Sequence, residues 1–325
     1  MESITSKYQK SSGDLRLAAL DLDCLPEWNS ALIALGGRVE TVARPEYLAS
    51  CEAGGWGRAE ALVVANDESL FYMSTLRGMR TMHGQLVSGF HAPLMVNGDV
   101  EFLRASLHAV ESYWQQQKVV GAVLAVGTSG EFTSLGTNWS LHESANSTTV
   151  DAGLLVGAKS PDGYIVQSPP NLARSMDVFV EMARACGGAG YEGLLTDDYA
   201  GALLWEMGDL LSLYACYRAS DDLPCQTAAA LWSRTAVHVM LANSSADALA
   251  NQAVLSAVAH TAVRRGAEII LPSFSPPMCP ASDIVGVNHG VTSGFCLATW
   301  RAARQNITTR EKENRLSGLF AAFAA

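Results

Sequence analysis

The chain has 325 residues, of which 49% are hydrophobic and only 17% charged, and its formal net charge is −10. This length and composition can bury a large core, which excludes a disordered protein and favours one compact domain or two fused halves. The acidic charge is spread along the sequence rather than clustered, so nucleic acid and anionic membranes are not expected partners.

The polar segment MESITSKYQKSSGD predicts a disordered lead over residues 1–13. It lacks the apolar core of a secretory signal, and no run of eighteen apolar residues follows, so we expect a cytoplasmic protein without a membrane span. The seven cysteines form no CxxC pair, which predicts neither a disulfide framework nor a metal site. They are expected to pack as small hydrophobic residues.

Continuous apolar residues at 61–66 predict a central strand that is buried on both faces. Residues 70–89, which follow, are expected to form helix and loop. Residues 128–149 are rich in Gly, Ser and Thr, and they predict a loop at the edge where open α/β sheets place their sites. Residues 150–158 are predicted to form a strand that pairs in a hairpin with 164–166.

The functional prediction depends mainly on the segment from His91 to Gly127. It contains a short strand, the turn Asn97-Gly98-Asp99, a helix to about Gln116 and a buried strand. Asp99 is a good N-cap, and the turn places Val100 at the positive end of the helix dipole, where covalent catalysts hold their nucleophile. None of Gly98, Asp99 and Val100 is a Ser, Cys or Thr. The sequence thus indicates a nucleophile elbow without its nucleophile, and the alternative is an ordinary strand-to-helix turn capped by Asp99.

The second half of the chain repeats the alternation of helices and strands. The expected elements are a helix at 172–186, a strand at 193–198, helices at 200–217 and 246–265, a strand at 268–271 and a closing hairpin-like unit at 283–300. We therefore expect one compact domain made of two halves, 14–168 and 169–325. The nearly apolar helix at 246–265 is expected to lie between sheets, which favours a layered α/β fold.

Three segments, taken in order, resemble the β-ketoacyl synthases of the thiolase superfamily, especially their chain-length-factor relatives. The first is the elbow, helix and strand of 91–127, and the second is the strand at 151–156 with the turn at 160–163. The third is the small-residue helix and the Gly-rich stretch within 249–295. The resemblance covers about residues 60–302. It implies an α/β, thiolase-like layered αβαβα fold built from two similar halves.

The resemblance also implies a subunit that has lost its catalytic residues. Ketosynthases of this kind use one Cys and two His, and the corresponding degenerate positions here are Asp99, Val100, Thr196 and Ala246. No cofactor is implied. The chain would pair with a catalytic ketosynthase subunit, as a heterodimer or heterotetramer served by an acyl carrier protein, and would set the length of a polyketide or fatty acyl chain. The candidate tunnel and interface residues are Asn97, Gly98, Phe102, Leu103, His289, Gly290 and Ser293.

Two other functions are compatible with the sequence. A self-assembling scaffold or shell protein without acyl chemistry would suit the high Ala content and the low charge. It would assemble with copies of itself, whereas a chain length factor requires a ketosynthase. An active acyltransferase with an unusual nucleophile ranks last, because no Cys or Ser lies at the elbow.

Overall fold

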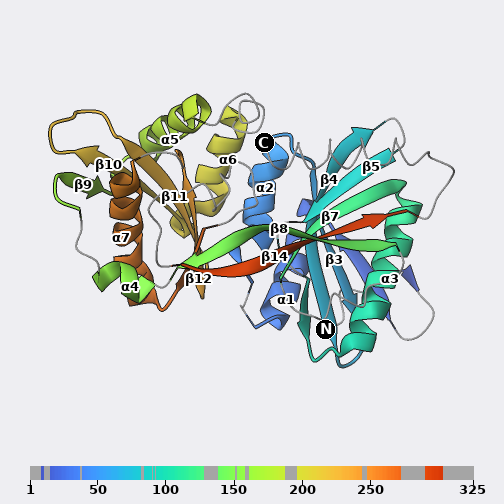
Figure 1. Ribbon diagram of the computed structural model, residues 1–325. Helices are drawn as coiled ribbons and strands as arrows, with labels where there is room; N and C mark the ends of the chain where they lie inside the picture. The colour runs from blue at the N-terminus through green and yellow to red at the C-terminus, as the bar shows by residue number, and fades with distance from the viewer. Residues whose placement is uncertain are drawn as a thin grey trace. The chain divides into compact units, whose positions relative to one another are not determined.

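The computed structural model divides the chain into two units (Figure 1). Unit 1 comprises Met1–Ser144 and Phe295–Gln305, and unit 2 comprises Ala145–Gly294 and Asn306–Ala325. The sequence had suggested a division at residue 168. The structure describes residues 9–10, 15–36, 39–81, 84–89, 91, 93–127, 138–150, 152–157, 161–186, 196–243, 247–271 and 290–302.

Unit 1 contains a mixed β-sheet and three α-helices. Its strands are β1 (Gln9–Lys10), β2 (Arg16–Leu20), β3 (Arg58–Ala65), β4 (Leu70–Thr81), β5 (Gly84–Gly89), β6 (Leu94–Val96), β7 (Val119–Gly127) and the greater part of β14 (Gly290–Arg301). Its helices are α1 (Leu25–Ala34), α2 (Pro45–Ala53) and α3 (Val100–Gln116), with 3-10 turns η1 (Leu22–Cys24) and η2 (Thr41–Ala43). The order across the sheet is β1-β2-β3-β4-β5-β7-β14, and β6 pairs with one end of β4. Among the described strand pairs of unit 1, only β5 and β7 are parallel neighbours, and α3 lies between them in the chain.

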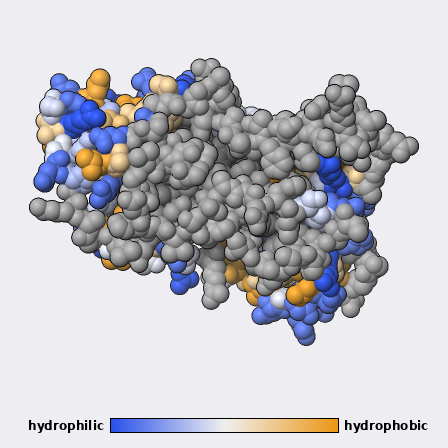
Figure 2. Space-filling view, viewed as in Figure 1, coloured by the Kyte–Doolittle hydropathy of each residue, from blue (hydrophilic) through white to orange (hydrophobic). Residues whose placement is uncertain are grey.

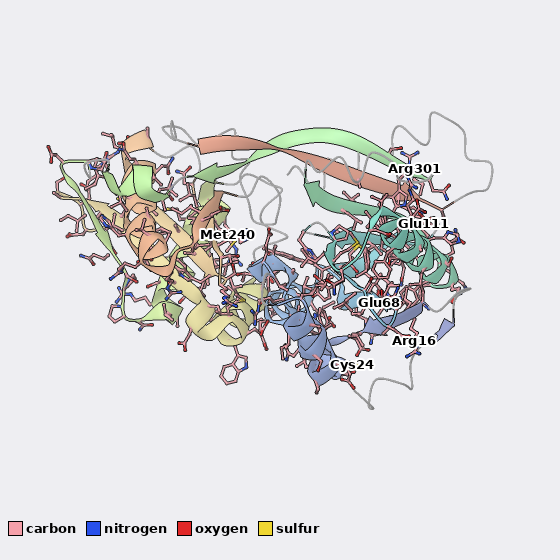
Figure 3. The ribbon with its side chains drawn as sticks, turned by 90° about the horizontal axis from the view of Figure 1, so that it is seen from below. Arg16, Cys24, Glu68, Glu111, Met240 and Arg301 are labelled. Atoms are coloured by element: carbon pink, nitrogen blue, oxygen red, sulfur yellow. The ribbon has the colours of Figure 1, made fainter. Side chains whose placement is uncertain are left out.

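Helices cover both faces of the unit 1 sheet. Strand β4 contributes side chains to both faces, because its alternate residues point to opposite sides. Phe71 and Met73 belong to the cluster that packs under α3. Tyr72 faces the other side, where its hydroxyl accepts a hydrogen bond from Trp28 Nε1 of α1 at 2.8 Å. On the α3 side, Trp139 Nε1 donates to Glu111 Oε1 at 2.5 Å, and Glu111 is labelled in Figure 3.

In its described residues, unit 2 contains a run of paired strands, most of them antiparallel, and four α-helices. Its elements are part of β8 (Trp139–Val150), α4 (Ala152–Gly157), β9 (Tyr164–Gln167), α5 (Leu172–Cys186), α6 (Asp197–Met207), η4 (Gly208–Leu210), β10 (Leu211–Arg218), β11 (Gln226–Trp232), β12 (Ala236–Leu241), α7 (Ala248–Arg265) and β13 (Glu268–Leu271). The strand order is β8-β13-β12-β11-β10-β9. Within the part of unit 2 that the structure describes, only β12 and β13 are parallel neighbours, and α7 connects them.

The core of unit 2 surrounds β11 and β12, whose residues are all buried. Burial on both faces explains why the two strands consist almost wholly of Ala, Leu, Val and Met. One of these side chains, Met240, is labelled in Figure 3. Helix α7 covers one face of this sheet, and α5 and α6 lie on the other (Figure 1). Helix α7 starts at the N-cap Asp247 and ends at Gly266, which adopts a left-handed φ of 66° that favours glycine.

Apart from the short β6, which pairs with β4 in unit 1, the same order of described elements occurs in both units: a strand, two helices, three antiparallel strands, then a helix that leads to a parallel strand. In each unit the paired strands carry helices on two faces. The prediction of a thiolase-like layered αβαβα fold, with α7 enclosed between two sheets, was therefore wrong. The long apolar face of α7 reflects its packing on one sheet and on α4, where Ser256 Oγ donates to the Leu155 carbonyl at 3.2 Å.

Several element predictions were wrong because tertiary packing overrode local composition. The expected helix and loop at 70–89 is the β4–β5 hairpin, and the expected loop at 128–149 contains strand β8 from Trp139. The expected strand at 150–158 includes helix α4, so β9 pairs with β10 instead. The expected helix at 200–217 changes into strand β10 at Leu211. The disordered lead at 1–13 falls largely outside the described residues. Of the closing hairpin-like unit at 283–300, residues 283–289 lie outside them, and the expected turn continues from Gly290 as strand β14, so the hairpin was wrong there.

Within the described part of the chain, no helix has the length and apolarity needed to span a membrane.

Candidate functional site

The predicted elbow in unit 1 is a helix cap. Asn97 has a positive φ of 53°, and the Asp99 side chain accepts a hydrogen bond from Phe102 N at 2.8 Å, which confirms the predicted N-cap. Val100 is the first helical residue and is 42% exposed. Phe102 and Leu103 are buried in the core beneath α3. These contacts give the residues of the turn a structural role at the start of α3. Their role in an acyl tunnel stays a prediction.

The other sequence-predicted positions are distributed over the chain. Thr196 is the N-cap of α6, where its Oγ1 accepts a hydrogen bond from Tyr199 N at 3.1 Å. Gly290 and Ser293 are part of strand β14. Ala246 and His289 lie outside the described residues. Thr196 therefore stabilises a helix end in unit 2, whereas the elbow belongs to unit 1.

A buried amide network joins three elements of unit 2 at the N-terminal end of α7. Gln226, the first residue of β11, is fully buried, and its Nε2 donates to Asn251 Oδ1 of α7 at 2.6 Å and to the Asn243 carbonyl at 2.5 Å. Its Oε1 accepts from Thr227 N at 2.9 Å and from Asn243 N at 3.2 Å. This side chain thus fixes the segment after β12 against both β11 and the first turn of α7.

A second polar group lies at the same helix end. Asp247 caps α7 by accepting a hydrogen bond from Leu249 N at 3.1 Å, it accepts another from the Tyr164 hydroxyl, and it lies 3.5 Å from the Arg218 guanidinium. The hydrogen bond from Tyr164, followed by that from Leu249 N, lowers the pKa of Asp247 below its ordinary value. The N-terminal end of α7 therefore already holds an ionised carboxylate, which opposes binding of a second anion there.

Two of the described cysteines, Cys51 and Cys216, do not supply a nucleophile. Cys216 is fully buried, and burial, reinforced by the neighbouring Cys225, raises its pKa to about 12. Burial also raises the pKa of Cys51 well above its ordinary value. A thiol with a raised pKa carries almost no thiolate at neutral pH, so these groups are unreactive. The prediction that the cysteines pack as small hydrophobic residues is confirmed for Cys24, Cys51 and Cys216.

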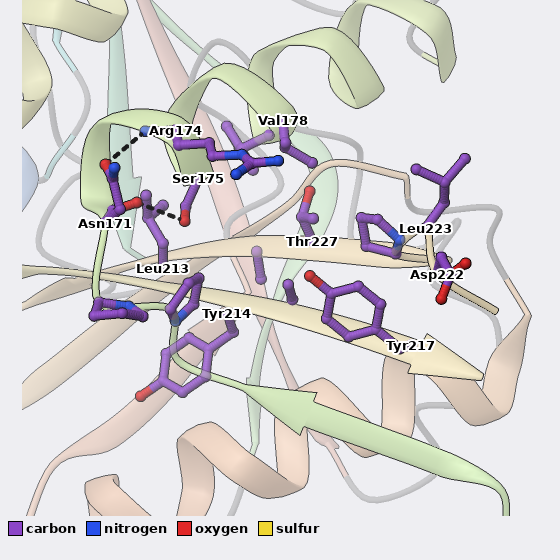
Figure 4. A pocket seen from close by; sticks show the side chains of 16 residues that line it. Asn171, Arg174, Ser175, Val178, Leu213, Tyr214, Tyr217, Asp222, Leu223 and Thr227 are labelled. Carbon is purple, nitrogen blue, oxygen red and sulfur yellow. Dashed lines mark hydrogen bonds between the residues drawn. The ribbon is translucent and has the colours of Figure 1, made fainter. Parts of the chain in front are cut away.

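Unit 2 contains a pocket of about 380 Å³ between α5 and the strands β10 and β11 (Figure 4). Such a volume lies at the lower end of the range for small-molecule sites. Its walls come from the segment before and within α5, from β10, from the loop between β10 and β11, and from the start of β11. Because Ala242 N donates to the Thr227 carbonyl at 2.9 Å, this end of the sheet is also the carboxyl end of β12. Ligands of open α/β sheets bind outside the carboxyl ends of their strands.

Polar side chains converge on this pocket from separate elements. Arg174 enters from α5, Asp222 from the β10–β11 loop, and the hydroxyls of Tyr217 and Thr227 lie between them in the view of Figure 4. Arg174 and Asp222 are both exposed and form no ion pair with the described residues. The pocket can therefore contact a ligand with one cation, one anion and two hydroxyl groups.

The rest of the pocket wall is apolar, and it continues onto the surface. Pro169, Pro170, Val178, Phe179 and Leu213 line it, and Leu223 at its loop side is 79% exposed. Figure 2 shows hydrophobic residues at the end of unit 2 that carries β9 and the β10–β11 loop. An apolar wall with a few polar groups is typical of a small-molecule site.

The sequence did not indicate this site. Its residues come from three segments, 169–179, 213–217 in β10 and 222–228; helix α6 separates the first two, and none of the three forms a motif by itself. Gln226 could have been noticed as a polar residue directly before the apolar run Thr227 to Trp232. A polar side chain next to a fully buried strand requires hydrogen-bond partners, but the sequence does not say which partners these are.

No protein-family model and no curated protein matches the sequence. Several solved structures are similar to this chain in fold. FemX superposes with a TM-score of 0.61 at 9% identity, covering 92% of this chain and 99% of FemX. The C-terminal domain of a putative lysylphosphatidylglycerol synthetase from Agrobacterium fabrum has a TM-score of 0.54 at 10% identity, covering 92% and 98%. A tandem GNAT protein from the clavulanic acid biosynthesis pathway has a TM-score of 0.53 at 12% identity, covering 90% and 100%.

These likenesses overturn the resemblance to β-ketoacyl synthases. The function that it implied, a chain length factor for polyketide synthesis, was wrong together with the thiolase-like fold, while pairing with a ketosynthase and an acyl carrier protein stays untested. At these identities the likeness concerns the fold alone. The chain has the mixed α/β fold of GNAT-like proteins.

Proposed function

We propose that this protein is a transferase that moves an acyl or aminoacyl group to a small acceptor bound in the pocket of unit 2. The observation that carries the proposal is the pocket itself: Arg174, Tyr217, Asp222 and Thr227 converge on an apolar cavity at the carboxyl end of β12. The fold supports it, because similar structures include a GNAT protein and a putative synthetase of lysylphosphatidylglycerol. Their names denote proteins of acyl and lysyl transfer.

In this reaction the pocket residues bind the acceptor amine, accept its proton and stabilise the carbonyl oxygen. An acceptor amine attacks the acyl carbonyl, the new C–N bond forms, and the bond from the carbonyl carbon to the leaving thiol or alcohol breaks. Asp222 binds the ammonium form of the acceptor and takes its proton, which leaves the amine lone pair free for attack. The Tyr217 hydroxyl can donate a hydrogen bond to the carbonyl oxygen as it becomes negative, and the Thr227 hydroxyl can do so by exchanging its bond to the Met182 sulfur for this one. After attack the nitrogen loses a second proton; one of the two protons leaves with the departing thiol or alcohol, and the other passes to water from the exposed Asp222.

Acetyl-CoA, named with the tandem GNAT structure, carries a diphosphate, and the N-terminal ends of α7 and α3 do not suit one. A diphosphate at a helix N-terminus is held by free backbone N–H groups that glycines allow it to approach. Here Asp247 and Asp99 cap α7 and α3 with their own carboxylates. The sequence ANSSAD before α7 also contains no glycine. We therefore assign no step to a diphosphate cofactor and expect donors without one to be used at least as well.

The test is an acyl-transfer assay on the full chain. Primary amines and short peptides are incubated with acyl thioesters, with and without a nucleotide portion, and with aminoacyl esters, and the products are identified by mass spectrometry. Asp222→Asn should reduce the transfer rate by about 100-fold, because it removes the proton acceptor. The matched control is Asp221→Asn, because Asp221 is an exposed neighbour outside the pocket. Absence of any transfer product, or equal rates in the two variants, would overturn the proposal.

A further inference from the structure

The charges of the pocket have opposite signs and lie at its two ends. In Figure 4, Arg174 projects from α5 at one end and Asp222 lies in the β10–β11 loop at the other, with Tyr217 and Thr227 between them. The two charged groups are not within ion-pair distance of each other. A ligand that neutralises both groups must therefore carry its own two charges apart.

The Arg174 end is also favourable for an anion for a second reason. Helix α5 is 15 residues long, and its N-terminal end lies at this side of the pocket, where Asn171 Oδ1 accepts a hydrogen bond from Arg174 N at 3.1 Å. The positive end of the helix dipole and the guanidinium then act on the same ligand group. Arginine can bind a carboxylate through two parallel hydrogen bonds.

The pocket is small, with a volume of about 380 Å³, and much of its wall is apolar. Val178, Phe179 and Leu213 are among the apolar residues that line it. A purely anionic ligand would leave Asp222 without a partner, and a simple alkylamine would leave Arg174 without one. A ligand with an apolar body and unlike charges at its ends satisfies all three parts of the wall.

We propose that the pocket takes a zwitterion of dipeptide size with an apolar body, whose carboxylate is bound at Arg174 and whose ammonium is bound at Asp222. This inference rests on the proposed function, since it names the acceptor of the same site. The ammonium at Asp222 is then the amine that receives the acyl group, and the carboxylate at Arg174 sets its position.

Isothermal titration calorimetry on the full chain tests this inference with three probes: leucyl-leucine, its N-acetyl derivative and its C-terminal amide. Leucyl-leucine should bind at low salt, and each of the capped peptides about 3- to 10-fold more weakly, because each loses one charge contact. Each variant should weaken binding only of the peptides that carry the charge bound by the replaced side chain. Arg174→Gln should weaken leucyl-leucine and the N-acetyl peptide but not the amide, and Asp222→Asn should weaken leucyl-leucine and the amide but not the N-acetyl peptide.

Two exposed residues outside the pocket provide the controls, Arg234→Gln in the turn between β11 and β12 and Asp221→Asn beside Asp222. Both should bind all three peptides as the unmodified chain does. Equal affinity for the three peptides, losses that do not match the variants, or no binding of leucyl-leucine would overturn the zwitterion. Transfer to simple amines without leucyl-leucine binding would reject this inference and keep the proposed function. Charge-matched binding of the peptides without any transfer would keep this inference and reject the proposed function.

Discussion

The buried amide of Gln226 offers the sharpest test of how unit 2 holds its site in place. Replacing Gln226 with Leu keeps a side chain of similar size but removes four hydrogen bonds, to Asn251 Oδ1, to the Asn243 carbonyl, and from the backbone N–H groups of Asn243 and Thr227. A hydrogen bond contributes about 1 kcal/mol net, and a buried partner left without one costs at least as much. The variant should therefore lose about 4 kcal/mol of the free energy of unfolding of unit 2.

A chain of two units need not unfold in one step, so a local measurement is required. Native-state hydrogen exchange by mass spectrometry reports on peptides that contain Thr227, Asn243 and Asn251. Exchange in these peptides should accelerate strongly in Gln226→Leu, while unit 1 peptides stay unchanged. Gln167→Leu is the matched control, because Gln167 is exposed on β9 of the same unit. A loss below about 1 kcal/mol, or equal acceleration in the control, would refute the reasoning.

Three further substitutions test the packing of unit 1 and of helix α6. Burial raises the pKa of Glu60 above its ordinary value of 4.5, despite the hydrogen bond from Tyr113. The native state therefore holds this proton more tightly than the unfolded chain does. As a result, the stability of the native state falls as the pH rises above that ordinary value. Glu60→Gln, whose amide oxygen can still accept from Tyr113, should remove this fall, and thermal melts between pH 4 and 8 that keep the parent's slope would contradict it. Gly98→Ala should cost about 1–3 kcal/mol, since the added Cβ would lie 2.7 Å from the Phe102 ring. Gly201→Ala in α6 meets no atom within 4 Å and should gain about 0.5–1 kcal/mol, so urea titrations that rank the two variants the other way would disprove the packing argument.

Elements with strong local signals were predicted well. Helix α3 has Asp99 as its cap and a continuous apolar face, and helix α7 has Asp247 at its start and Gly266 at its end. Strands β3 and β7 were recognised as uninterrupted apolar runs. In these cases the sequence within one element contains most of the information, because caps and periodicity act over a few residues.

Strand β4 shows why local reasoning failed elsewhere. From Phe71 to Leu76 every residue is buried, with Tyr72 and Ser74 on one face and Met73 and Thr75 on the other. A strand with both faces buried shows neither polar alternation nor a helical period, and the polar residues among them suggested a loop. Ser74 is polar because its Oγ lies 2.7 Å from His91 Nε2, a contact that cannot be read from either segment alone.

The mistaken family resemblance has a related cause. A strand, a turn, a capped helix and a parallel strand occur in many α/β folds, so their presence does not determine the order of strands in the sheet. That order depends on pairing between distant segments, such as Cys296 with Val126. The candidate site depends on it even more, because Arg174 and Asp222 become neighbours of one pocket only once α5 has packed on β10.

The pairing of β14 with β7 also affects how the chain is made. Antiparallel register from Phe295 to Arg301 completes the sheet of unit 1, although its partner strand ends at Gly127. The ribosome needs on the order of ten seconds or more to synthesise the intervening residues. During that time the β7 edge of the nascent sheet has no partner, and an open edge is prone to pair with other chains. Folding of unit 1 should therefore finish late, after unit 2 has been synthesised, and a chain truncated before β14 should aggregate.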